Sequence, residues 1–259
     1  MKKVLTIAGS DCSGGAGIQA DIKTVTAHRM YAMSAITSLT AQNTTGVFGV
    51  LDTPASFITD QLDCIFRDIF PDAVKIGMVS NVDNIAAIAA SLKSYQAKNI
   101  VVDPVMVATS GGKLLQDDAV RALIELLFPI GSIITPNLEE AACLSGKKIV
   151  SREDMQTAAE KISAMTSGAV LIKGGHLGDS ADDLLYCDGK SEWFSAPRIN
   201  TKNTHGTGCT LSSAIACNLA AGYSVADSVK NAKAYVEDAL AAGLNLGHGS
   251  GPLNHCCRL

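Results

Sequence analysis

The chain has 259 residues, of which 47% are hydrophobic and only 5% aromatic, so aliphatic side chains must fill one sizeable core. Its net charge of -4 at pH 7 gives no basic surface of the kind that binds nucleic acid or anionic lipid. We therefore expect a single α/β domain over residues 1–259 that has no nucleic-acid partner.

Polar residues interrupt the hydrophobic runs well before the roughly 20 residues that a transmembrane helix needs. Residues 4–8 are too short for the apolar region of a signal peptide, and we expect a first strand there. The eight cysteines form no C-x-x-C pair, and a chain of this length needs no disulfides. These features predict a cytoplasmic protein that does not associate with a membrane.

Short apolar segments alternate with amphipathic ones along most of the chain. We expect strands at Val4–Ala8, Ala35–Ala41, Ala73–Ile76, Ile100–Asp103, Ser132–Thr135 and Ala169–Lys173, and helices at Ile18–His28, Pro54–Ile69, Asn81–Tyr95, Asp117–Phe128, Ser151–Met165, Thr210–Ala221 and Val225–Ala242. This alternation predicts a parallel sheet with helices on both faces. Residues 184–194 differ, because two alternating runs flank Asp188-Gly189 and predict a β hairpin.

A glycine-rich turn follows the first predicted strand. Its Gly15-x-Gly17-x-x-Ala20 pattern matches a dinucleotide-binding turn, which also needs an acidic residue at the end of the second strand. That strand ends instead at Gln42-Asn43, and the next acid is Asp52. The turn therefore favours close backbone approach to a small ligand, with Asp21 facing it one turn into the helix. A plain turn with a solvated Asp21 is the alternative.

Polar side chains follow three of the buried strands. Asp103 precedes a proline, where it fits either an acid that serves Mg²⁺ or a simple turn former. Asn137 and Glu140 share one face of a helix start, so they fit either a metal–phosphate cluster or an N-terminal cap. Lys173 enters Gly174-Gly175, where it fits a phosphate ligand or a lysine that extends into solvent.

The segment at residues 203–210, Asn-Thr-His-Gly-Thr-Gly-Cys-Thr, directly precedes a helix-like run. Unpaired backbone N–H groups at the positive end of a helix bind anions, most often phosphate. Cys209 falls in the first turn, where the helix dipole favours the thiolate. His176 and His205 are expected to border the site, and neither has an identifiable partner. We expect a phosphate-handling enzyme with a cysteine in its site.

The strand ends should bring these residues together, because the carboxyl ends of parallel strands meet at one edge of a sheet. Glycines, acids and a lysine at that edge are typical of nucleotide phosphoryl transfer and not of hydride transfer.

Seven motifs in matching order resemble one known family. They are residues 9–21 (Gly-Ser-Asp-x-Ser-Gly-Gly-Ala-Gly-Ile-Gln-Ala-Asp), 41–44 (Ala-Gln-Asn-Thr), 75–78 (Lys-Ile-Gly-Met), 103–106 (Asp-Pro-Val-Met), 135–140 (Thr-Pro-Asn-Leu-Glu-Glu), 173–176 (Lys-Gly-Gly-His) and 204–210 (Thr-His-Gly-Thr-Gly-Cys-Thr). The chain resembles the hydroxymethylpyrimidine/phosphomethylpyrimidine kinases of thiamine biosynthesis, which are ribokinase-like vitamin kinases. The resemblance implies a three-layer αβα sandwich with a central, mostly parallel sheet and a small β hairpin near the site.

The resemblance also implies two successive ATP-dependent phosphorylations. The first acts on the hydroxymethyl group of 4-amino-5-hydroxymethyl-2-methylpyrimidine, and the second acts on the resulting monophosphate. An amide offers a hydrogen-bond donor beside an acceptor, which suits a residue that reads the aminopyrimidine edge. The implied roles are substrate binding by Gln42, Asp21 and Met78, ATP binding by Lys173 and Asn137, and Mg²⁺ binding by Asp103 and Glu140.

The same resemblance implies different roles for residues 206–208 and for Cys209. Gly206, Thr207 and Gly208 are expected to hold the transferring phosphoryl group through backbone N–H groups, while Lys173 and Mg²⁺ spread its charge. Cys209 is expected to take the proton of the substrate hydroxyl. Its replacement by alanine would then slow the first phosphorylation far more than the second.

Three other interpretations remain at this point. A pyridoxal kinase shares the Gly-x-Gly-Cys loop, although Gln42 favours the pyrimidine where methionine would favour a B6 vitamer. A nucleotide-binding regulatory protein without turnover would not need Lys173 and Cys209 together. A thiol enzyme with Cys209 as nucleophile would leave Lys173 and the glycines unexplained. We expect a two-fold homodimer, with the hairpin at residues 184–194 as a lid or a dimer edge.

Overall fold

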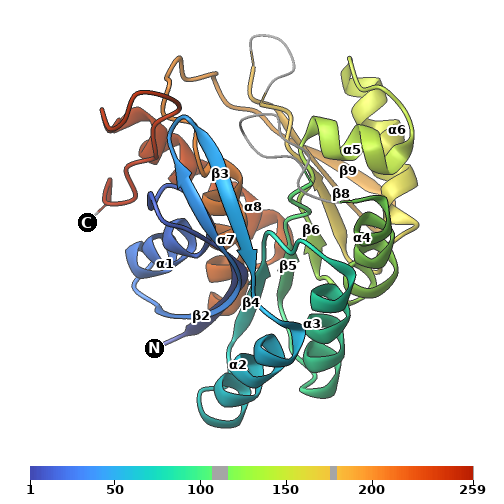
Figure 1. The fold of residues 1–259 in the computed structure, drawn as a ribbon. Coiled ribbons are helices and arrows are strands. Elements are labelled where there is room, and N and C mark those ends of the chain that lie inside the picture. The colour runs from blue at the N-terminus through green and yellow to red at the C-terminus, as the bar shows by residue number, and fades with distance from the viewer. Residues whose placement is uncertain (107–115, 176–179, 259) are drawn as a thin grey trace.

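The computed structural model describes residues 1–106, 116–175 and 180–258 (Figure 1). Within them, one sheet has the strand order β3-β2-β1-β4-β5-β6-β7-β8-β9. Its central strands are parallel: β2 (Tyr31–Asn43), β1 (Lys3–Asp11), β4 (Ala73–Ile76), β5 (Ile100–Val102), β6 (Ile133–Ile134) and β7 (Ala169–Ile172). Antiparallel strands complete both edges, β3 (Gly46–Asp52) beside β2, and the hairpin of β8 (Asp183–Cys187) and β9 (Lys190–Phe194) beside β7.

Helices cover both faces of this sheet (Figure 1). One face carries α1 (Gly17–Ala27), α7 (Thr207–Ala221) and α8 (Val225–Ala241), and the other carries α2 (Ala55–Asp68), α3 (Val82–Ser94), α4 (Asp117–Ala122), α5 (Leu138–Ser145) and α6 (Arg152–Ser163). Side chains of a strand point alternately to the two faces. In β5, Val101 packs with the first group of helices, while Ile100 and Val102 pack with the second. The expected three-layer sandwich is confirmed.

Helix α7 lies in the middle of its layer and is buried from Thr210 to Ala220. Serine and alanine fill much of this stretch, and their small side chains let the helix lie close to β4 and β5 and between α1 and α8. A helix buried all round has little freedom to shift. Its N-terminus is therefore held firmly at the carboxyl edge of the sheet.

The structure departs from the expected elements in two places. The exposed strand β3 was not expected, and it extends the sheet beyond β2. The expected helix Asp117–Phe128 is α-helical only to Ala122, continues as a π-helical turn over Leu123–Leu127, and ends in a 3₁₀ turn that contains Pro129. Among the described residues, no helix is both long and apolar enough to span a bilayer.

Candidate active site

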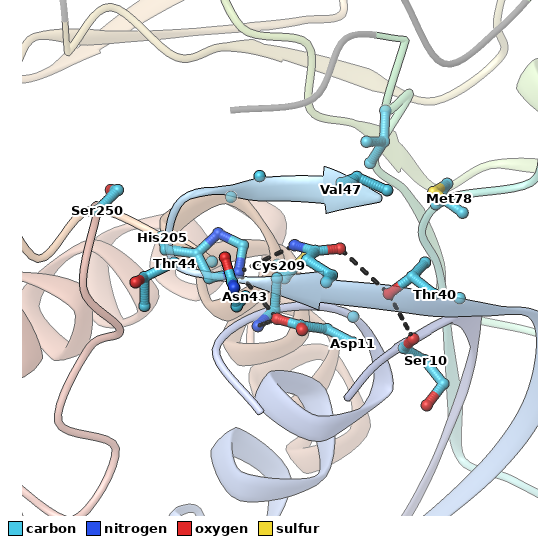
Figure 2. A pocket seen from close by; sticks show the side chains of 18 of the residues that line it. Ser10, Asp11, Thr40, Asn43, Thr44, Val47, Met78, His205, Cys209 and Ser250 are labelled. Atoms are coloured by element: carbon cyan, nitrogen blue, oxygen red, sulfur yellow. Dashed lines mark hydrogen bonds and ion pairs between the residues drawn. The ribbon is translucent and has the colours of Figure 1, made fainter. Parts of the chain in front are cut away.

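A cavity of about 520 Å³ lies at the carboxyl edge of the parallel strands. Residues that follow β1, β4, β5, β6 and β7 line it, together with the start of α7, and the β2–β3 hairpin forms one side (Figure 2). Most of the site residues expected from the sequence line this cavity: Gln42, Met78, Asp103, Asn137, Glu140, Lys173, Gly206, Gly208 and Cys209. Strand ends that are far apart in the sequence thus converge on one space.

Lys173 and Asp103 form an ion pair in the cavity, with 2.7 Å between Lys173 Nζ and Asp103 Oδ1. The hydroxyl of Thr135 also donates to Asp103 Oδ1, at 3.1 Å. Burial opposes the charge of Asp103, but the ammonium groups of Lys173 and Lys75 outweigh it and hold the pKa of that carboxyl below its usual value. The pair therefore brings a full positive and a full negative charge to one wall of the cavity.

Asn137 and Glu140 form a complete capping box at the start of α5. Asn137 Oδ1 accepts from the backbone N–H of Glu140 at 2.9 Å, and Glu140 Oε2 accepts from that of Asn137 at 2.8 Å. The cap that the spacing allowed is therefore present, and both residues also line the cavity. Burial raises the pKa of Glu140 to about 7, even though the charge of Lys173 opposes this rise.

Two carboxylates, Asp103 and Glu140, face the space where a divalent cation was expected. Mg²⁺ commonly binds one or two carboxylates and takes its remaining oxygens from water and phosphate. In the described part of the chain, no group of three or more His, Cys, Asp or Glu side chains could hold a metal. The donor set fits an ion that arrives with a phosphate-bearing ligand, and not a tightly held structural metal.

The first turn of α7 supplies backbone N–H groups next to the Lys173–Asp103 pair. Gly206 has a φ of +83°, and a Cβ there would lie 1.9 Å from Gly15 O, so only glycine fits. A Cβ on Gly208 would lie 3.2 Å from Lys173 Nζ. The positive end of α7 and a lysine therefore meet at one point, as an anion site requires.

Thr207 contributes to this turn differently from its neighbours. Its hydroxyl donates to Thr204 O at 2.7 Å, and its side chain is not part of the cavity wall. It stabilises the turn and offers the site no side-chain group.

Cys209 lines the cavity, but its expected thiolate is not the resting form. Burial raises the pKa of the thiol to about 11, although the charge of Lys75 and the N–H of Gly17 both favour ionisation. Desolvation therefore outweighs the helix dipole that the sequence argument relied on. Near pH 7 the thiol therefore carries its proton in this structure.

Asp21 does not line the cavity, which contradicts the substrate contact that the resemblance implied. Its side chain is fully buried, and both carboxylate oxygens accept from Lys75 Nζ, at 2.9 and 2.8 Å. The hydroxyls of Thr6 and Ser213 donate to the same carboxylate at 2.5 and 2.7 Å. Helix α1 turns Asp21 toward the sheet, where the residue joins β1, β4 and α7.

The structure also pairs Asp11 with His205, which the sequence argument had left without a partner. His205 Nε2 lies 2.8 Å from Asp11 Oδ2 (Figure 2). Burial opposes the charge of Asp11, but donors from His205, Ser13 and Ala16 hold its pKa well below the usual value. No local pattern signals a pair 194 residues apart. His176 lies outside the described residues.

The tip of the β2–β3 hairpin is tied to a segment near the end of the chain. Thr44 O accepts from the N–H of Ser250 at 3.0 Å, and Thr44 Oγ1 accepts from those of His248 and Gly249, both at 3.2 Å. The N–H of His205 donates to Gly251 O at 3.0 Å. The 247–252 segment thus joins the hairpin to the loop before α7.

The sequence is similar to one family of known proteins over almost its whole length. Residues 11–254 match the family model of phosphomethylpyrimidine kinase. The chain is 51% identical to a hydroxymethylpyrimidine/phosphomethylpyrimidine kinase of Rhizobium meliloti, over 97% of this chain and 96% of that protein. It is 49% identical to the thiamine biosynthesis bifunctional protein ThiED of Geobacter sulfurreducens, over 97% of this chain and 52% of that protein. The chain therefore spans about half of that bifunctional relative.

A solved structure agrees with these relationships. The ADP complex of Bacillus subtilis pyridoxal kinase superposes with a TM-score of 0.92, at 38% identity over 99% of this chain and 98% of that one. The expected ribokinase-like fold is thereby confirmed. The sequence matches, the fold and the residues gathered at the strand ends all agree, and the chain belongs to the phosphomethylpyrimidine kinase family.

Proposed function

We propose that this chain is an ATP-dependent kinase of thiamine biosynthesis. Its substrate would be 4-amino-5-hydroxymethyl-2-methylpyrimidine, which it converts to the monophosphate and then to the diphosphate. One observation carries this proposal: Lys173, Asp103 and the first turn of α7 meet in a cavity that also contains Gln42. Such a site can bind a transferring phosphate at one end and a polar heterocycle at the other.

The anion site would bind the phosphoryl group during transfer. Backbone N–H groups of the first turn of α7 would bind its oxygens, and Lys173 would add a positive charge. ADP in the Bacillus subtilis relative supports ATP as the donor. Asp103 and Glu140 would hold Mg²⁺, which neutralises phosphate charge when bound, and Asn137 would lie beside the nucleotide.

Cys209 would contact the substrate hydroxyl as a neutral thiol. Phosphoryl transfer passes through a loose transition state, in which the bond to the attacking oxygen is still weak. The hydroxyl thus needs little help from a base until that bond forms. The alcohol proton would therefore leave late, to a phosphate oxygen or to water. In the second phosphorylation the acceptor oxygen is already anionic, and no base is required.

Gln42 and Met78 would form the heterocycle end of the cavity. Gln42 lies on β2 and Met78 follows β4, so the amide of one and the thioether of the other line the cavity from the two strands that flank β1. An amide can match an amino group and a ring nitrogen with one acceptor and one donor. A methionine at position 42 would lack both groups.

Pyridoxal kinase is the second candidate, because a pyridoxal kinase superposes so closely over the whole chain. An ATP-consumption assay that offers the aminopyrimidine alcohol and pyridoxal in parallel, with products identified by mass, distinguishes the two. Successive formation of the pyrimidine monophosphate and diphosphate would support the proposal. Pyridoxal phosphate as the sole product would refute it while leaving the phosphate chemistry intact.

We also propose that the chain forms a homodimer in the cytoplasm. Strand β3 is an edge strand, and it exposes Phe48, Val50 and Leu51, whereas edge strands are usually protected from pairing. This strand replaces the 184–194 hairpin as the expected dimer edge. All eight cysteines are free thiols, which suits a reducing compartment. Light scattering should give twice the chain mass, and Phe48→Glu should shift it toward the monomer.

A further inference from the structure

The side-chain amide of Gln42 lies between His205 and Thr40, and the other hydrogen bonds of these two residues determine where their protons point. The structure places the amide nitrogen, Nε2, 3.2 Å from His205 Nε2, and the amide oxygen, Oε1, 3.2 Å from Thr40 Oγ1. His205 Nε2 is also bound to Asp11, and Thr40 Oγ1 is also bound to Ser10 (Figure 2). The amide therefore forms the middle of a chain of hydrogen bonds from Asp11 to Ser10.

The Asp11 end of this chain determines which ring nitrogen of His205 bears a proton. The Asp11 carboxylate accepts from the backbone N–H groups of Ser13, Gly15 and Ala16 and from the Ser13 hydroxyl. A carboxylate with these donors is ionised and can only accept. The atom of His205 that faces it at 2.8 Å, Nε2, must carry a proton, whether the ring is neutral or charged.

The same proton decides which end of the Gln42 amide faces His205. An N–H group cannot accept a hydrogen bond, so an amide nitrogen 3.2 Å from a protonated Nε2 would place two donors against each other. An amide oxygen in that place would share the Nε2–H of His205 with Asp11. The two amide atoms are told apart by such partners and not by their positions.

The other end of the amide gives the same answer independently. Thr40 Oγ1 lies 3.0 Å from the backbone oxygen of Ser10, which can only accept, so the single hydroxyl proton of Thr40 points there. Thr40 Oγ1 can then accept, and its partner on Gln42 must be a donor. The amide NH₂ group belongs on the Thr40 side.

We propose that Asp11 and His205 are positioning residues that hold the Gln42 amide with its oxygen toward His205 and its nitrogen toward Thr40. This orientation decides the order in which the amide presents its acceptor and its donor to a ligand. Given the proposed function, on which this step rests, the acceptor side would bind the exocyclic amino group of the pyrimidine. The donor side would bind the adjacent ring nitrogen, so the amino group would lie on the side of α7.

The position of His205 makes it suited to this task. It is nearly fully buried, its ring packs against Gly15, and its N–H is fixed to Gly251 O. It also directly precedes Gly206, the first residue of the anion site. One residue therefore joins the heterocycle end of the cavity to the phosphate end.

The orientation can be measured without any substrate. In the ¹⁵N-labelled protein, a long-range ¹H–¹⁵N spectrum should show His205 Nε2 as the protonated ring nitrogen. Nuclear Overhauser contacts should join the side-chain NH₂ of Gln42 to the Thr40 methyl group. Contacts from that NH₂ to the Hε1 of His205, or an unprotonated Nε2, would overturn the proposal. This measurement decides the orientation even if the proposed function fails.

A matched pair of variants tests the effect on specificity. Glutamine can place an N–H where His205 has Nε2, whereas asparagine is too short, so His205→Gln should retain the positioning and His205→Asn should lose it. The probes are the aminopyrimidine alcohol and its 4-oxo analogue, which reverses the order of donor and acceptor. We expect the ratio of their kcat/KM values to fall about tenfold in His205→Asn and to stay within about threefold in His205→Gln.

Two outcomes separate positioning from a structural role. A general loss of structure would lower kcat/KM for both alcohols together and leave their ratio unchanged, which would overturn the proposal for specificity. An equal fall of the ratio in both variants would also overturn it, because the effect would then not depend on a side chain long enough to place an N–H at the position of Nε2. If the wild type phosphorylates neither alcohol, the proposed function is wrong, and the spectra still decide the orientation of Gln42.

Discussion

Replacing Lys75 by methionine would leave the Asp21 carboxylate in the protein interior without its cation. The hydroxyls of Thr6 and Ser213 would remain as donors, so the carboxylate would keep part of its stabilisation. Removing one partner of a buried ion pair costs about 3–5 kcal/mol, and methionine is similar in volume to the lysine side chain. With two donors left, we expect the free energy of unfolding to fall by about 3 kcal/mol.

Urea denaturation would measure this loss directly, and thermal unfolding should show a decrease in Tm of roughly 6–12 °C for a domain of this size. The exposed i,i+4 pair of Arg67 and Asp63 is the control. Arg67→Met should leave the urea midpoint close to that of the wild type, because an exposed ion pair contributes little to stability. A loss below about 1 kcal/mol in Lys75→Met would refute the argument that the buried charges depend on each other.

A double variant tests the second part of this reasoning. Asp21→Asn combined with Lys75→Met removes both charges, so it should recover much of the stability that Lys75→Met loses. If Asp21 contacted the substrate, as the resemblance implied, the double variant would also show a raised KM for the pyrimidine. An unchanged KM would agree with the wholly buried position of Asp21.

Three further predictions concern the cavity. Lys173→Met should lower kcat for both phosphorylations by about 10²–10³ in single-turnover assays with little change in KM, and a rise in KM alone would contradict a role in transfer. Because the pKa of Cys209 is raised to about 11, Cys209→Ala should slow both steps by a similar factor. A decrease in rate confined to the first phosphorylation would instead support Cys209 as the acceptor of the hydroxyl proton. The pKa of Glu140 is raised from 4.5 to about 7, so the protonated group adds to the free energy of unfolding. This contribution is complete below pH 4.5 and is lost as the pH rises through about 7. Urea unfolding across that range should show the wild type losing stability relative to Glu140→Gln, and parallel curves would argue against a buried, protonated Glu140.

The sequence was most informative where burial and periodicity act together. Strand β4 has the expected bounds, because four apolar or buried residues between turns have few alternatives. The central strands are apolar on both faces, and that pattern alone implied helices on both sides of a parallel sheet. The residues that follow those strands were placed at one edge for the same reason, and they do line one cavity.

Features that depend on side-chain direction or on distant partners could not be predicted this way. Strand β3 is exposed along most of its length, so it has no buried face to produce an alternating pattern. Spacing placed Asp21 one turn into α1 but could not show that the turn directs it toward Lys75. The dipole argument at Cys209 was local, whereas its pKa is set mainly by the surrounding burial.

The link between the hairpin tip and the 247–252 segment has a consequence for how the protein is made. Thr44 and His205 receive their backbone partners from Ser250 and Gly251, which are translated long after the hairpin itself. Domains can begin to fold from the N-terminus while synthesis continues. The cavity wall, however, cannot be completed on the ribosome until residues 247–252 have emerged. A nascent chain that has already formed its central sheet would therefore still lack this part of the cavity wall.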